Sequence, residues 1–158
     1  MIFDIGIYQL DIDVEKTASF YRINGGITCD CAGCRNYAKA VEELPADILQ
    51  FFRQFGVDPA KPIEVSATPA ACEDFVYYGG FYYICGTYQE NKEHRTPAAE
   101  KESQFNQPSW VDLDDSRSVC FIKPRWGILD ENFPTPVIQM EIGFTLPWML
   151  DEPNPYIF

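Results

Sequence analysis

Apolar and polar residues alternate strictly late in the chain, from Ile138 to Leu146. Successive side chains of a β-strand point to opposite faces, so this pattern predicts a strand with one buried and one solvated face. Shorter runs rich in β-branched and aromatic residues predict further strands. These strands are expected at residues 3–8, 10–14, 19–23, 27–29, 63–68, 75–78, 81–84, 110–114 and 119–123.

Turn-forming residues separate the predicted strands. Gly79-Gly80 lies between two aromatic runs, which is a strong signal for a two-residue hairpin turn. Asn24-Gly25-Gly26 and residues 115–117 also have turn chemistry. At Tyr8-Gln9 the alternation changes phase, which indicates a bulge or the end of the first strand.

A helical pattern occupies residues 35–55. An apolar stripe with helical spacing starts at Tyr37, is interrupted by Pro45 and resumes up to Phe55. Proline suits the first turn of a new helix, and Gly56 suits a helix end. The sequence therefore predicts an α+β fold, a mainly antiparallel sheet with one kinked helix or helix pair, at about residues 35–55, packed on one face.

The domain organisation follows from length and local composition. A chain of 158 residues fits a single domain, residues 1–158. In residues 89–108 eight of twenty positions are Glu, Lys, His or Arg, which predicts a mobile surface excursion inside a hairpin. Residues 151–158 contain two prolines and are expected to be a loose tail.

The chain is strongly acidic, with 24 Asp and Glu against 12 Lys and Arg and a net charge of −12. This balance argues against a nucleic-acid binder and against docking on anionic lipid. No apolar run approaches the roughly 18–20 residues of a membrane span, and the first residues do not resemble a signal peptide. We expect a cytoplasmic protein that binds a basic protein partner, in one specific version as an immunity protein binds a nuclease toxin.

Three of the six cysteines carry the chemistry of greatest interest, Cys29, Cys31 and Cys34. They lie at a predicted strand-to-helix junction, where strand alternation and a tight turn at Gly33 allow all three sulfurs to converge. A tetrahedral zinc site needs four ligands, and Cys85 at the end of a predicted strand is the best fourth. The sequence thus predicts one zinc ion at these four cysteines in a non-catalytic, protein-binding domain.

Two alternatives use the same cysteines differently. A thiol at a helix N-terminus has a lowered pKa, so Cys31 and Cys34 are candidates for the dithiol of a thiol-disulfide oxidoreductase. The chain shows no thioredoxin-like βαβ unit in support of that enzyme. Buried cysteines can also be inert and pack as small hydrophobes.

A group of aromatic residues suggests a partner surface. Alternation sends some of Tyr77, Tyr78, Tyr82 and Tyr83 outward, and tyrosine is enriched at protein interfaces. The alternative is that both faces of this segment are covered, one by the helix and the other by the excursion at residues 89–108.

Three blocks of sequence resemble a known group. They are Cys31-Ala-Gly-Cys34-Arg-Asn-Tyr37, Phe55-Gly-Val-Asp-Pro59 and Leu146-Pro-Trp-Met-Leu-Asp-Glu152. Together they are similar to a family of small bacterial proteins without an established activity. The resemblance implies a bacterial, cytoplasmic origin, and it assigns no catalytic residue.

Overall fold

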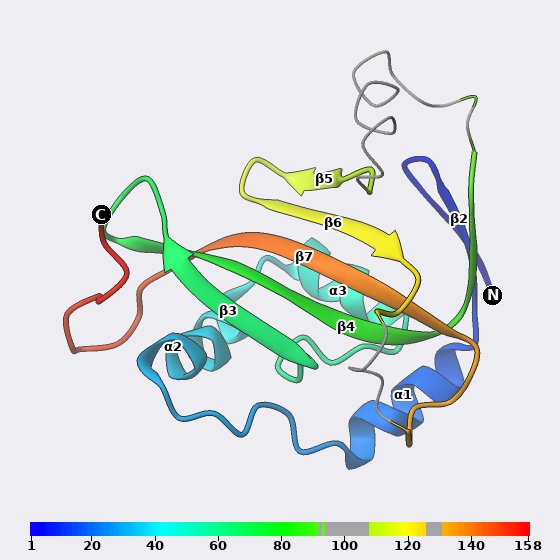
Figure 1. The fold of residues 1–158 in the computed structure, drawn as a ribbon, viewed down its shortest axis with the longest axis horizontal. Coiled ribbons are helices and arrows are strands. Elements are labelled where there is room, and N and C mark those ends of the chain that lie inside the picture. Colours follow the sequence, from blue (N-terminus) through cyan, green and yellow to red (C-terminus); the bar gives the residue numbers. More distant parts are fainter. Residues whose placement is uncertain (92, 94–107, 126–130) are drawn as a thin grey trace.

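The computed structural model describes residues 1–91, 93, 108–125 and 131–158. In these residues the chain is α+β, with seven strands in one antiparallel sheet (Figure 1). The order is β1-β2-β4-β7-β6-β5, and β3 also pairs with β4. The strands are β1 (Ile2–Ile5), β2 (Tyr8–Ile12), β3 (Glu64–Pro69), β4 (Phe75–Glu90), β5 (Val111–Asp114), β6 (Arg117–Ile122) and β7 (Val137–Pro147).

The helices are α1 (Val14–Ile23), α2 (Ala32–Ala40) and α3 (Ala46–Gln54), with a short 3₁₀ turn, η1 (Val41–Glu43), between the last two. The predicted helix pair is thus confirmed, and Pro45 stands directly before α3. Phe52 of α3 is fully buried, with its ring edge-on to Tyr82 of β4 and Phe144 of β7. Figure 1 shows the helices along one side of the sheet. This packing makes the main core.

The predicted strand near the C-terminus is β7, and it is central because it pairs with both β4 and β6. Its apolar positions are buried, Ile142 at 1% exposure. The opposite face of β7 is less exposed to solvent than the alternation predicts. Gln139 is also buried, where it donates to Glu141 and accepts from the backbone of Arg125.

Strand β4 replaces the hairpin predicted at Gly79-Gly80. It runs without a break through both glycines. A Cβ on Gly80 would stand 2.5 Å from the carbonyl oxygen of Glu64, so the glycine is needed where β3 approaches β4. The hairpin prediction was wrong because a glycine pair is also typical of close backbone approach.

The N-terminal region differs from the prediction in two places. The phase change is a hairpin turn between β1 and β2, where Gly6 has a φ of +56°. Residues 19–23 belong to α1 instead of a strand. The side chain of Asp13 caps this helix by accepting from the backbone N–H of Lys16. Residues 27–29 lie outside any strand.

The C-terminal segment is not the loose tail that the prolines predicted. Asn154 donates to the carbonyl oxygen of Glu73 at 2.8 Å, and Glu152 pairs with Arg35 of α2 at 2.6 Å. The ring of Tyr156 packs against Trp148. Of the predicted excursion, residues 89 and 90 complete β4, while residues 92 and 94–107 lie outside the described part of the chain.

Candidate functional site

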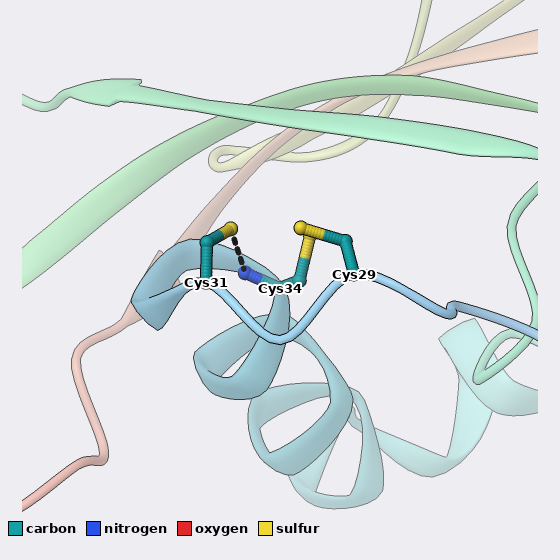
Figure 2. Close-up of side chains that lie close together, drawn as sticks. All are labelled: Cys29, Cys31 and Cys34. Atoms are coloured by element: carbon teal, nitrogen blue, oxygen red, sulfur yellow. Dashed lines mark hydrogen bonds between the residues drawn. The ribbon is translucent and has the colours of Figure 1, made fainter.

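The cysteine cluster lies at the N-terminus of α2. Cys31 is the N-cap of this helix, and its sulfur accepts from the backbone N–H of Cys34 at 3.5 Å. Cys34 lies in the first turn, and Cys29 lies in the extended segment that leads to the cap. Figure 2 shows the three side chains pointing to the same side of the chain.

The three sulfurs form a compact group. Every pair of Sγ atoms among Cys29, Cys31 and Cys34 lies within 4.8 Å. Tetrahedral zinc at 2.3 Å from each sulfur requires sulfurs about 3.8 Å apart, so small rotations of the side chains suffice. All six cysteines of the chain are free thiols. The cluster could therefore hold a metal ion.

The cluster has an exposed side and a buried side. Cys29 and Cys31 are exposed, whereas Cys34 is buried against the sheet. The backbone N–H of Cys34 lowers the pKa of Cys31, and hydrogen bonding with the Cys29 and Cys34 thiols lowers it further. Burial raises the pKa of Cys34 to about 12, and its two neighbours add to the rise. In the metal-free site, Cys31 therefore loses its proton more readily than Cys34.

Contacts from three other parts of the chain position the first turn of α2. A Cβ on Gly33 would stand 2.5 Å from the hydroxyl of Tyr156 and 2.9 Å from Cβ of Ala67 in β3. The hydroxyl of Tyr78 in β4 donates to the carbonyl oxygen of Gly33 at 2.9 Å. Burial raises the pKa of Tyr156, and negative charge on Cys31 adds to the rise. Gly33 is therefore required by close packing beside the cluster.

Asn36 connects α2 to the chain that follows β7. Its amide nitrogen donates to the carbonyl oxygen of Pro147 at 3.1 Å and to the hydroxyl of Tyr78 at 3.0 Å. Its carbonyl oxygen accepts from the backbone N–H of Met149 at 2.6 Å. The sequence interpretation missed Asn36, although a polar residue on the apolar face of a helix was a signal. It also missed Tyr156, for which no local signal exists.

Cys85 does not join the cluster, so its prediction as the fourth ligand was wrong. The first turn of α2 contacts β4 at Tyr78, and Cys85 lies seven residues further along the same strand. At about 3.3 Å per residue, the Cα atoms of Tyr78 and Cys85 are about 23 Å apart along the strand. Cys85 is buried beside α1, where its backbone N–H donates to Thr17, and burial raises its pKa. The predicted hairpin would have folded the strand back, and its absence removes this ligand.

The two remaining cysteines also lie apart from the cluster. Cys72 is exposed and close to Asp74. Cys120 is fully buried in β6, and burial followed by the negative charge of Glu141 raises its pKa to about 12.

The predicted tyrosine surface is mostly interior. Tyr78, Tyr82 and Tyr83 are fully buried, and only Tyr77 of the four is exposed, at 42%. The hydroxyl of Tyr82 donates to the carbonyl oxygen of Pro59, and the ring of Tyr83 packs on Phe133. These three residues are covered, as the alternative stated above expects, but the excursion that it placed over one face lies mostly outside the described residues.

Comparison of the chain with protein-family models, with curated proteins and with solved structures finds no match. The bacterial resemblance of the three sequence blocks thus stays a prediction, and every residue role rests on geometry. Among the described residues, no helix has the length and apolar character needed to cross a membrane.

Proposed function

We propose that the chain is a non-catalytic domain that binds one zinc ion through the thiolates of Cys29, Cys31 and Cys34. The observation that supports this most is the convergence of three free thiols within 4.8 Å of one another. Thiolates are soft ligands that favour zinc and other thiophilic metals over magnesium or calcium. Three thiolates around one Zn²⁺ ion leave a net negative charge. The positive partial charge at the N-terminus of α2 stabilises such a site.

Zinc would also offset the cost of forming a thiolate at Cys34 in the metal-free cluster. Burial penalises the thiolate of Cys34, and the nearby charge on Cys31 penalises it further. A divalent cation among the sulfurs removes these penalties, because a coordinating thiol is deprotonated by the metal. Binding energy of this kind contributes to folding energy.

The fourth zinc position has no cysteine to fill it, and a water molecule would complete the tetrahedron. Catalytic zinc sites also keep one open position. Here the neighbouring hydroxyls belong to Tyr78 and Tyr156, whose pKa values are raised. Both stay protonated at neutral pH and cannot accept a proton from a bound water. Three anionic thiolates also reduce the acidity of the metal. These properties favour a stabilising role over hydrolysis.

Elemental analysis of the purified protein tests the proposal. We expect about one zinc per chain, retained through dialysis and removed by a strong chelator with a fall in melting temperature. Cys31→Ser should lose zinc and stability together. Cys120→Ser is the matched control, because Cys120 is buried in β6 away from the cluster, and it should keep its zinc. A wild-type protein that takes up no zinc after reconstitution in reducing buffer contradicts the proposal.

A second candidate is thiol-disulfide exchange at Cys31 and Cys34. Its support is the contrast between an exposed Cys31 with a lowered pKa and a buried Cys34 with a raised one. The Cys31 thiolate would attack a substrate disulfide and release one thiolate, which takes up a proton. Cys34 would then lose its proton and displace the second thiol, leaving a Cys31–Cys34 disulfide and a reduced substrate. Zinc-free protein with a Cys31–Cys34 disulfide after oxidation, and with Cys29 still reduced, favours this candidate.

Binding of a basic protein remains part of the proposal on the ground of charge. A net charge of −12 steers basic partners toward the domain and repels nucleic acid. Recovery of a basic partner that falls steeply with added salt supports this part. Micromolar binding to duplex DNA at physiological salt contradicts it.

A further inference from the structure

A hollow of about 780 Å³ lies among α1, η1, α3 and the loop at residues 56–61. Its size is in the range of small-molecule sites. The buried side chains of Tyr21, Val41 and Val57 contribute an apolar floor. No cysteine lines it, so it is separate from the proposed zinc site.

The rim of the hollow is more basic than the rest of the chain. Its charged residues are Arg22, Arg53 and Lys61 against Glu42 and Asp58. Bases therefore outnumber acids here, whereas the whole chain has 12 bases against 24 acids. The hollow is therefore less acidic than the protein as a whole.

The charges on the loop side are already engaged. Lys61 donates to the carbonyl oxygen of Tyr21 at 2.6 Å, which places a positive charge on the carbonyl end of α1. A carboxylate oxygen of Asp58 accepts from the backbone N–H of Ala60. Lys61 therefore offsets the negative end of α1, and it also pairs with the carboxylate of Asp58 at 3.8 Å.

The guanidinium of Arg53 has no such partner. Arg22 reaches Glu15 and Ser19 within α1. Arg53, in the last turn of α3, is exposed, and its side chain forms no hydrogen bond or ion pair with the described residues. An unpaired guanidinium beside an apolar floor is suited to a carboxylate, sulfonate or phosphate group.

The loop is held in place before any ligand arrives. Gly56 has a φ of +78°, and a Cβ there would stand 2.5 Å from the carbonyl oxygen of Val14 and 2.9 Å from the backbone nitrogen of Ala18. The loop thus packs directly on α1. A preformed hollow binds with little ordering cost.

We propose that this hollow binds a small amphiphilic anion, with its apolar body on Tyr21, Val41 and Val57 and its anionic group on Arg53. The probe is 8-anilinonaphthalene-1-sulfonate, whose fluorescence rises in apolar surroundings. At about 0.15 M salt, where the charge of the whole protein is screened beyond about 8 Å, we expect one saturable site. A charged hydrogen bond corresponds to a loss of about tenfold or more in affinity, so Arg53→Gln should weaken binding by that factor.

The matched control is Arg125→Gln, which makes the same charge change at a residue that pairs with Glu141, outside the hollow. We expect it to bind the sulfonate as the wild type does. The neutral analogue N-phenyl-1-naphthylamine should bind wild type and Arg53→Gln equally. Unchanged melting temperatures would show that both variants are folded, which the exposure of Arg53 leads us to expect.

Three results overturn the inference. One is the absence of saturable sulfonate binding by the wild type. Another is an equal loss of affinity in Arg53→Gln and Arg125→Gln, which would reflect general charge. The third is binding of the neutral analogue as tight as that of the sulfonate. Because the titration needs no metal, these results leave the zinc proposal untouched.

Discussion

Replacement of Asn36 by alanine tests how the cysteine helix is attached to the rest of the fold. The substitution removes three hydrogen bonds, to Tyr78, Pro147 and Met149. The Tyr78 hydroxyl keeps Gly33 as its acceptor, so two backbone groups, the Pro147 carbonyl and the Met149 N–H, lose their partners. Both are half-buried, and an unpaired group of this kind costs about 1–3 kcal/mol. We expect a loss of about 3 kcal/mol.

Urea denaturation followed by fluorescence measures this loss, with the slope of the transition expected to stay unchanged. For a chain of this size a loss of about 3 kcal/mol lowers the melting temperature by about 6–12 °C. Asn24→Ala is the control, because its side chain accepts one hydrogen bond, from Gly26, outside the core, and it should cost less than about 1 kcal/mol. An Asn36→Ala protein as stable as the Asn24→Ala protein would refute the argument that Asn36 anchors α2.

Three further changes have definite expected outcomes. Gly33→Ala forces a methyl group against the Tyr156 hydroxyl and should cost about 1–3 kcal/mol in the same denaturation assay, and Tyr156→Phe in the same chain should restore part of this. Ile142→Asp places an unpaired charge at the centre of the sheet and should cost several kcal/mol, whereas an equally stable variant would remove β7 from the core. In metal-free protein, the lowered pKa of Cys31 leaves more thiolate at neutral pH than at Cys120, whose pKa is about 12. Peptide mapping after brief alkylation near pH 7 should therefore find Cys31 modified before Cys120, and equal modification of these two would contradict the pKa difference.

The elements that the sequence predicted well depend on neighbours close in the chain. Alternation from Ile138 to Leu146 located β7, and the apolar stripe interrupted by Pro45 located the helix pair. The errors arose where one local pattern serves two structures. Gly79-Gly80 is typical of a turn, yet these glycines allow close contact between strands. Aromatic residues in α1 favoured a strand, although the cap at Asp13 and the helical spacing of Thr17 and Tyr21 were available as signals.

The same distinction holds for the candidate site. Three cysteines within six residues converge because a helix cap and one turn bring them together, which the sequence can predict. The position of Cys85 depended on whether β4 turned back, a long-range property. Contacts of Gly33 with Tyr156 join residues far apart in the chain, and local periodicity contains no information about them.

The role of Cys29 separates the two candidate functions of the cluster. Thiol-disulfide exchange needs one attacking and one resolving thiol, which Cys31 and Cys34 provide, so Cys29 would contribute only by lowering the pKa of Cys31. A metal site needs every available sulfur, and Cys29 lies within 4.8 Å of both others although it precedes the helix cap. Sheet residues and Tyr156 already fix the first turn of α2, so the extended segment before it gains most order from a shared ligand. A third converging thiol therefore favours zinc over exchange chemistry, and loss of zinc from Cys29→Ser with an intact Cys31–Cys34 pair is the result that this reasoning requires.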